Sequence, residues 1–273
     1  MPTVIELTEA PDPARCCEQL AGLPYRLFLD SATPGTRLGR YSFLTADPVA
    51  VVVSKGEQTL IARGPGSVVR NSHHDGPGDA LARVGQLLGP HRCDAIDGLP
   101  PFQGGAAGYL AYDWGRTLER LPPSRYDDLA LPDAVLGIYD WVIAWDHRAS
   151  RAWLISTGIP ETNEAARSRR AEERASEVMT HLQGERDLRH TIANVSAAIS
   201  SAAPSYPVEG GWWDRRLDLR SSFTHDEYLS AVARVREYIL AGDIFQTNLS
   251  QRFEVPLTEP PWDLYLRMRL RNA

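Results

Sequence analysis

The sequence is poor in cysteine: it has three in 273 residues, and two of them, Cys16 and Cys17, are neighbours. Such a set gives no plausible disulfide framework and no pair with the spacing of a zinc site. We therefore expect a reduced, cytoplasmic compartment.

Long apolar runs and an excess of basic residues are also missing. No run approaches eighteen apolar residues, and residues 1–9 lack the basic and apolar segments of a signal peptide. We expect neither a membrane span nor export. The formal net charge of −6 argues against a nucleic-acid surface, which normally carries a basic excess. With 43% hydrophobic residues, the chain can form one large globular domain or two ordinary ones.

A glycine-rich segment at residues 99–116 does not have the pattern of a phosphate-binding loop. It contains neither Gly-x-Gly-x-x-Gly nor a Gly-Lys-Ser or Gly-Lys-Thr ending. Small residues bounded by aromatic ones instead predict a buried strand that another backbone approaches closely.

Residues 223–255 predict one helix followed by one strand. Thr224 and Glu227 have the spacing of a capping box, and Gly242 stands where a left-handed residue would end the helix. From residue 244 the hydrophobic period is two, so one face is mostly apolar and the other mostly hydrogen-bonding. The polar face is either a solvated edge or the wall of a cavity, with Gln246, Asn248, Ser250 and Arg252 on it. The composition does not separate these alternatives.

The remaining patterns predict a strand-rich first part and a helical connection. A helix begins at Asp12 and Pro13, strands cover residues 25–30 and 40–44, and a hairpin covers 49–54 and 58–63. A helix follows at 80–88, and then a second hairpin of 135–145 and 151–156 turns through Asp146 and His147. Residues 162–183 predict a surface helix whose charges form a solvated face, and 186–219 a linker. A last helix at 258–273 has no end signal, so the chain looks cut there.

Three separated motifs carry a family resemblance. They are Asp30–Ser31 with residues 39–43, the segment 101–113, and the segment 242–253. In this order they resemble the large subunits of the chorismate-aminating enzymes, the family of aminodeoxychorismate synthase component I and anthranilate synthase component I. Two residues favour the aminodeoxychorismate branch. The anthranilate branch usually has Glu at the position of Asp30 and an aliphatic residue at the position of Asn248. Residues 131–133 and 137–141 also resemble that branch.

The resemblance implies an α+β fold of two antiparallel sheets packed face to face with helices outside, incomplete at the C-terminus. Residues 1–160 would be the N-terminal region, 161–220 a surface helix and linker, and 221–273 the start of the chorismate-binding domain. The implied reaction converts chorismate and ammonia to 4-amino-4-deoxychorismate for p-aminobenzoate and folate synthesis, with Mg²⁺. A glutamine amidotransferase subunit would supply the ammonia. There are two alternatives to this function. The protein could be an anthranilate synthase, or it could be a non-catalytic fragment that binds an aromatic amino acid or the amidotransferase.

The resemblance also implies which residues act. The family's catalytic and metal-binding groups fall downstream of Ala273, so we predict no catalytic and no metal-binding residue in this chain. Relatives hold tryptophan at positions that match Ser31, Arg40 and Tyr41, where Arg40 could bind the carboxylate. The strand residues Gln246, Asn248 and Arg252 would brace a pocket. Alternatively, Arg40 braces the sheet edge with a nearby Asp and Ser31 caps a turn.

Overall fold

The computed structural model describes residues 1–33, 39–64, 74–77, 79–122, 126–184, 213–214, 216 and 218–271, with 74–77 and 213–214 as backbone only. These residues form two compact units. The first contains the described residues up to 122 and 129–184, and the second contains 126–128 and those from 213 onward. Most of the predicted linker at 186–219 lies outside the described residues. Across the described ranges, no helix combines the length and apolarity needed to cross a bilayer.

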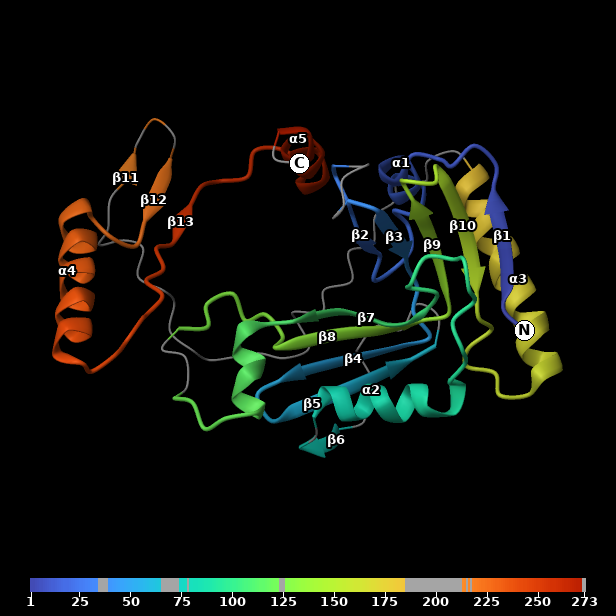
Figure 1. Cartoon of the computed structure of the whole chain (residues 1–273), viewed down its shortest axis with the longest axis horizontal. Coiled ribbons are helices and arrows are strands. Elements are labelled where there is room, and N and C mark those ends of the chain that lie inside the picture. Colours follow the sequence, from blue (N-terminus) through green and yellow to red (C-terminus); the bar gives the residue numbers. More distant parts are fainter. Residues whose placement is uncertain are drawn as a thin grey trace. The chain divides into compact units, whose positions relative to one another are not determined.

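The first sheet of the first unit is antiparallel, with the order β1-β10-β9-β3-β2. Its strands are β1 (Thr3–Leu7), β2 (Leu27–Leu29), β3 (Tyr41–Thr45), β9 (Trp141–Asp146) and β10 (Arg151–Ser156). Helix α1 (Pro13–Gln19) packs on β3, and α3 (Glu164–Gln183) packs on β1 and β10 (Figure 1). The predicted start of α1 is confirmed, because the side chain of Asp12 accepts a hydrogen bond from the backbone N–H of Arg15.

The second sheet is also antiparallel, with the order β6-β5-β4-β8-β7. Its strands are β4 (Ala50–Lys55), β5 (Gln58–Arg63), β6 (His74–Pro77), β7 (Gly105–Leu110) and β8 (Ala134–Tyr139). Helix α2 (Ala80–Leu88), extended by the short helix η2 (Gly89–His91), covers β4 and β8 (Figure 1). Buried Val52, Val84 and Ile138 form the core beneath it. Antiparallel sheets with helices on their faces confirm the predicted α+β class.

The predicted strand at residues 135–145 is wrong, because the chain divides at Asp140 into two strands of different sheets. β8 ends at Tyr139 in the second sheet, and β9 begins at Trp141 in the first. Both strands are almost wholly buried, so neither shows an alternation of polar and apolar residues that would reveal a break. The phenolic O–H of Tyr139 donates to the carbonyl of Tyr25, which lies just before β2, and so ties the end of β8 to the entry of the first sheet.

The sequence predicted that the charges of α3 form a solvated face, and this is wrong for part of the helix. The carboxylate of Asp140 is fully buried, and its Oδ2 lies 3.3 Å from both Arg170 Nη2 and Arg174 Nε. Arg174 Nη2 also lies 2.7 Å from Asp47 Oδ2. Burial raises the pKa of Asp140, and the two guanidiniums oppose that rise. Three arginines of one helix face, Arg167 included, are thus bonded to loops of the sheets.

Strand β7 was predicted to be buried, but it is not. Within the described ranges it is the last strand of its sheet, and Tyr109 is 43% exposed. The predicted close approach of a second backbone is confirmed at Gly108. A Cβ atom there would lie 1.9 Å from the carbonyl oxygen of Val135. The short helix η3 (Tyr112–Thr117) follows.

The second unit contains β11 (Trp213–Asp214), β12 (Leu219–Ser221), β13 (Phe253–Glu254), α4 (His225–Ala241) and α5 (Pro261–Arg271). The capping box of Thr224 and Glu227 is confirmed, as is the left-handed Gly242 at φ 80°. The predicted strand from residue 244 is wrong in its extent, because only Phe253 and Glu254 pair, with β12. An extended segment becomes a strand only where a neighbouring strand pairs with it. Among the described residues, only Phe253 and Glu254 of this segment have such a neighbour.

We expect Arg174→Met to lower the free energy of unfolding by about 3 kcal/mol, because it removes a partner from two poorly exposed carboxylates. Denaturant unfolding followed by circular dichroism measures this. Arg169→Met, on the exposed side of the same helix, is the control and should change stability by less than about 0.5 kcal/mol. Equal stability of the two variants would contradict a structural role for the buried ion pairs.

Candidate functional site

Six residues at one end of the first sheet form what we call the Arg40 cluster: Ser31, Arg40, Tyr41, Ser42, Asp146 and His147. Ser31 follows β2, Arg40 precedes β3, and Asp146 ends β9. β3 and β9 are antiparallel, and Tyr41 lies opposite Asp146 in their register. This register brings the start of β3 beside the turn that joins β9 to β10.

Arg40 and Asp146 form the charged part of the cluster. Nε and Nη2 of Arg40 both donate to Asp146 Oδ2, at 3.1 and 2.7 Å. The other carboxylate oxygen accepts from the backbone N–H groups of Arg148 and Ala149. The hydrogen bond from Arg40, followed by those from the turn, holds the pKa of Asp146 below its ordinary value although the carboxylate is poorly exposed.

Hydroxyl groups and rings complete the cluster. Ser31 donates through Oγ to the carbonyl of Tyr41, and the backbone N–H of Ser31 donates to Ser42 Oγ at 3.0 Å. Ser42 Oγ also lies 2.7 Å from Nε2 of His147. The guanidinium carbon of Arg40 lies 4.7 Å from the centre of the Tyr41 ring, a cation–π distance. The cluster therefore offers a cation over an aromatic face, with polar groups beside it.

The structure brings the predicted Ser31, Arg40 and Tyr41 together. Of the two roles considered for Arg40, the structure shows the ion pair with an aspartate at the sheet edge. Binding of an amino acid by Arg40 stays a prediction. The Arg40 side chain is 47% exposed, so it is accessible to a ligand. Sequence reasoning missed Ser42 and Asp146, because the register that joins β3 to β9 leaves no signal in either strand. His147 lies in a turn, as predicted.

The three residues predicted to brace a pocket lie in the second unit. Gln246 and Asn248 are exposed and outside any strand. Arg252 forms ion pairs with Asp128 at 2.7 Å and Glu254 at 2.6 Å, and Asp128 raises its pKa. Arg252 thus ties the loop at residue 128 to β13, while a role of the three residues in lining a pocket stays a prediction.

The motif at residues 101–105 has a structural use. The Gln103 amide exchanges hydrogen bonds of 2.9 Å with the backbone N–H and carbonyl of Ile96. Gly104, at φ 120°, lies so close to Thr157 that an added Cβ would be 2.9 Å from its methyl carbon. Both residues position the segment that leads into β7.

Mg²⁺ does not fit the described residues. Within the ranges that the structure describes, no three side chains of His, Cys, Asp or Glu gather where they could hold a metal ion. We therefore assign no step of a reaction to a metal in this part of the chain.

We expect the contribution of the Arg40–Asp146 pair to disappear in acid. A carboxylate whose pKa is lowered by folding stabilises the protein above its unfolded pKa of about 4, and this stabilisation is lost as the pH falls through the folded pKa. Arg40→Gln should therefore reduce the free energy of unfolding at pH 7 slightly, as expected for a pair whose cation is exposed.

Denaturant titrations of both proteins from pH 7 to 2 measure that difference, which should shrink toward zero at the acid end. Arg148→Gln, an exposed residue of the same turn, should stay parallel to wild type throughout. A gap between wild type and Arg40→Gln that is constant over this range would show that the pair contributes nothing through its charge.

Comparison with known proteins identifies the family of the chain. The family model for chorismate binding enzymes matches residues 26–273. Aminodeoxychorismate synthase component 1 of Escherichia coli K12 is 27% identical over 99% of this chain and 51% of its own length. Anthranilate synthase alpha subunit 2 of Arabidopsis thaliana, a chloroplast protein, is 32% identical over 89% of this chain and 38% of its own.

The crystal structure of anthranilate synthase component I from Streptococcus pneumoniae TIGR4 has the same fold. It superposes with a TM-score of 0.62 over 98% of this chain and 52% of that one, at 21% identity. The chain thus spans about half the length, or less, of these relatives. The extent of the family match nevertheless covers most of the sequence, and the chain belongs to the chorismate binding enzyme family.

Proposed function

We propose that the protein is the large subunit of an aminodeoxychorismate synthase, with this chain as its N-terminal part. The reaction replaces the 4-hydroxyl group of chorismate with an amino group from ammonia, and a glutamine amidotransferase subunit supplies the ammonia. The product, 4-amino-4-deoxychorismate, leads to p-aminobenzoate and folate. The main support is the family match over residues 26–273, together with Asp30 and Asn248 at positions where the anthranilate branch differs.

Two bacterial aminodeoxychorismate synthases match nearly the whole chain. Those of Escherichia coli and Salmonella typhimurium each match 99% of it, at 27% and 28% identity. We infer that the chain supplies the framework and one side of the chorismate pocket.

Anthranilate synthase is the second candidate. The proteins of Arabidopsis thaliana and Cereibacter sphaeroides with that name are each 32% identical to this chain, over 89% of it. This identity exceeds that of the aminodeoxychorismate synthases, so the assignment to a branch depends on the product and not on overall likeness.

Product analysis decides between the two branches. The protein is read from the undisturbed gene, including any reading frame beyond Ala273, and is incubated with chorismate, ammonium and Mg²⁺. We expect 4-amino-4-deoxychorismate, detected by chromatography and as p-aminobenzoate after addition of a suitable lyase. Anthranilate as the product would overturn the proposal in favour of the second candidate. The 273-residue chain alone should give no turnover, because we place the catalytic groups downstream.

We further propose that the Arg40 cluster binds an aromatic amino acid such as tryptophan. Titration calorimetry of the 273-residue chain with L-tryptophan should show binding, and Arg40→Gln should weaken it about tenfold through loss of a charge-assisted hydrogen bond. Arg148→Gln removes an equal charge from the neighbouring turn and should bind as wild type does. Absence of heat at millimolar tryptophan would count against this site.

A further inference from the structure

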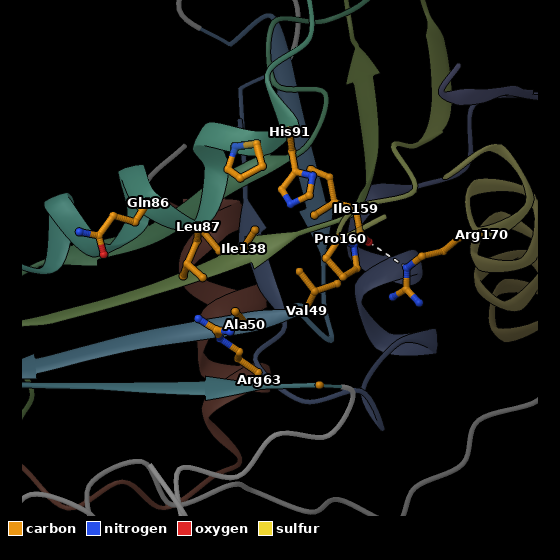
Figure 2. Close-up of a pocket in the computed structure, with 12 residues that line it drawn as sticks. Val49, Ala50, Arg63, Gln86, Leu87, His91, Ile138, Ile159, Pro160 and Arg170 are labelled. Atoms are coloured by element: carbon orange, nitrogen blue, oxygen red, sulfur yellow. Dashed lines mark hydrogen bonds between the residues drawn. The ribbon is translucent and has the colours of Figure 1, made fainter. Parts of the chain in front are cut away.

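A cavity of about 420 Å³ lies in the first unit, between the C-terminal end of α2 and the second sheet. In Figure 2, Leu87 and His91 lie on one side of it, Ala50 and Arg63 on the opposite side, and Pro160 and Arg170 at a third side. The Arg40 cluster contributes no residue to its lining. The volume is within the range of small-molecule sites in proteins, which is roughly 300–1,000 Å³.

Most of the cavity wall is apolar. The apolar side chains come from the start of β4, from β8, from α2 and η2, and from the segment after β10; they are Val49, Ala50, Leu87, Pro90, Ile138, Ile159 and Pro160. Elements distant in sequence thus share one apolar surface. A ligand with a ring or hydrocarbon body would bury that body against it.

Among the described residues, the ionisable side chains that line the cavity are Arg63, His91 and Arg170, and none of them is a carboxylate. Arg170 is already held, because its Nε donates to the carbonyl of Ile159 at 2.8 Å and its Nη2 pairs with Asp140. Arg63 is exposed and has no hydrogen-bond or ion-pair partner among the described residues. The free charge at the cavity is therefore positive.

His91 adds a polar atom without a partner. Its Nδ1 is buried and makes no hydrogen bond with any described group. Burial, and then the charge of Arg167, lower the pKa of His91, so the imidazole is neutral near pH 7. A buried polar atom without a partner is costly, and a polar group on a bound molecule would satisfy it.

We propose that this cavity binds a small carboxylate with an apolar body. The apolar wall receives the body, Arg63 binds the carboxylate, and His91 Nδ1 bonds to a polar atom of the ligand. Arg170 keeps its partners and serves to hold the wall at Ile159. This site is independent of the proposed reaction, because none of its residues belongs to the Arg40 cluster or to the motif that ends at residue 253.

The test compares two probes of equal shape, trans-cinnamate and its neutral amide, cinnamamide, in titrations with the 273-residue chain. We expect cinnamate to bind at least about tenfold more tightly than the amide, and Arg63→Gln to abolish that preference. Arg92→Gln, an exposed arginine next to His91 that does not line the cavity, removes an equal charge and should bind cinnamate as wild type does.

A spectroscopic measurement locates the binding. The NMR signals of the His91 imidazole, assigned with His91→Gln, should shift when cinnamate is added and stay in place with Arg63→Gln. Equal affinity for both probes, an unchanged preference in Arg63→Gln, or His91 signals that do not move would each overturn the proposal. None of these results depends on turnover of chorismate.

Discussion

The buried carboxylate of Asp140 is the constraint on which the first unit depends. It stands where the chain leaves the second sheet and enters the first, so both sheets are fixed at this residue. Its backbone carbonyl accepts from the N–H and the hydroxyl of Thr157, and its side chain is paired with Arg170 and Arg174. Because an uncompensated buried charge is strongly destabilising, α3 must lie where its arginines reach this crossing.

That constraint extends to both surfaces to which we assign a ligand. Arg174 also binds Asp47 ahead of β4, and Arg170 holds the carbonyl of Ile159 at the wall of the apolar cavity. β9 runs from the crossing to Asp146, which is the charged partner in the Arg40 cluster. The two candidate sites therefore share one rigid support although they lie on different sheets.

Local signals in the sequence predicted those elements whose ends are fixed by their own residues. Thr224 with Glu227 and Gly242 fixed both ends of α4, and Asp12 fixed the start of α1. The break at Asp140 could not be predicted, because strands buried on both faces have no alternation. The lack of strand pairing at residues 244–252 could not be predicted either. Alternation indicates which faces a strand would have, but not whether another strand lies beside it. The ionic role of Arg174 depends on that same unpredicted crossing.

The Arg40 cluster was predicted only in part, for the same reason. Motif likeness identified Ser31, Arg40 and Tyr41, whereas Asp146 enters through a strand register that no local pattern encodes. Asp146 also defines how a ligand would bind. Two backbone N–H groups hold its Oδ1, so the carboxylate cannot swing away, and Arg40 uses Nε and Nη2 on its Oδ2. A ligand carboxylate would therefore join the pair at the remaining Nη1 edge of the guanidinium, without displacing Asp146.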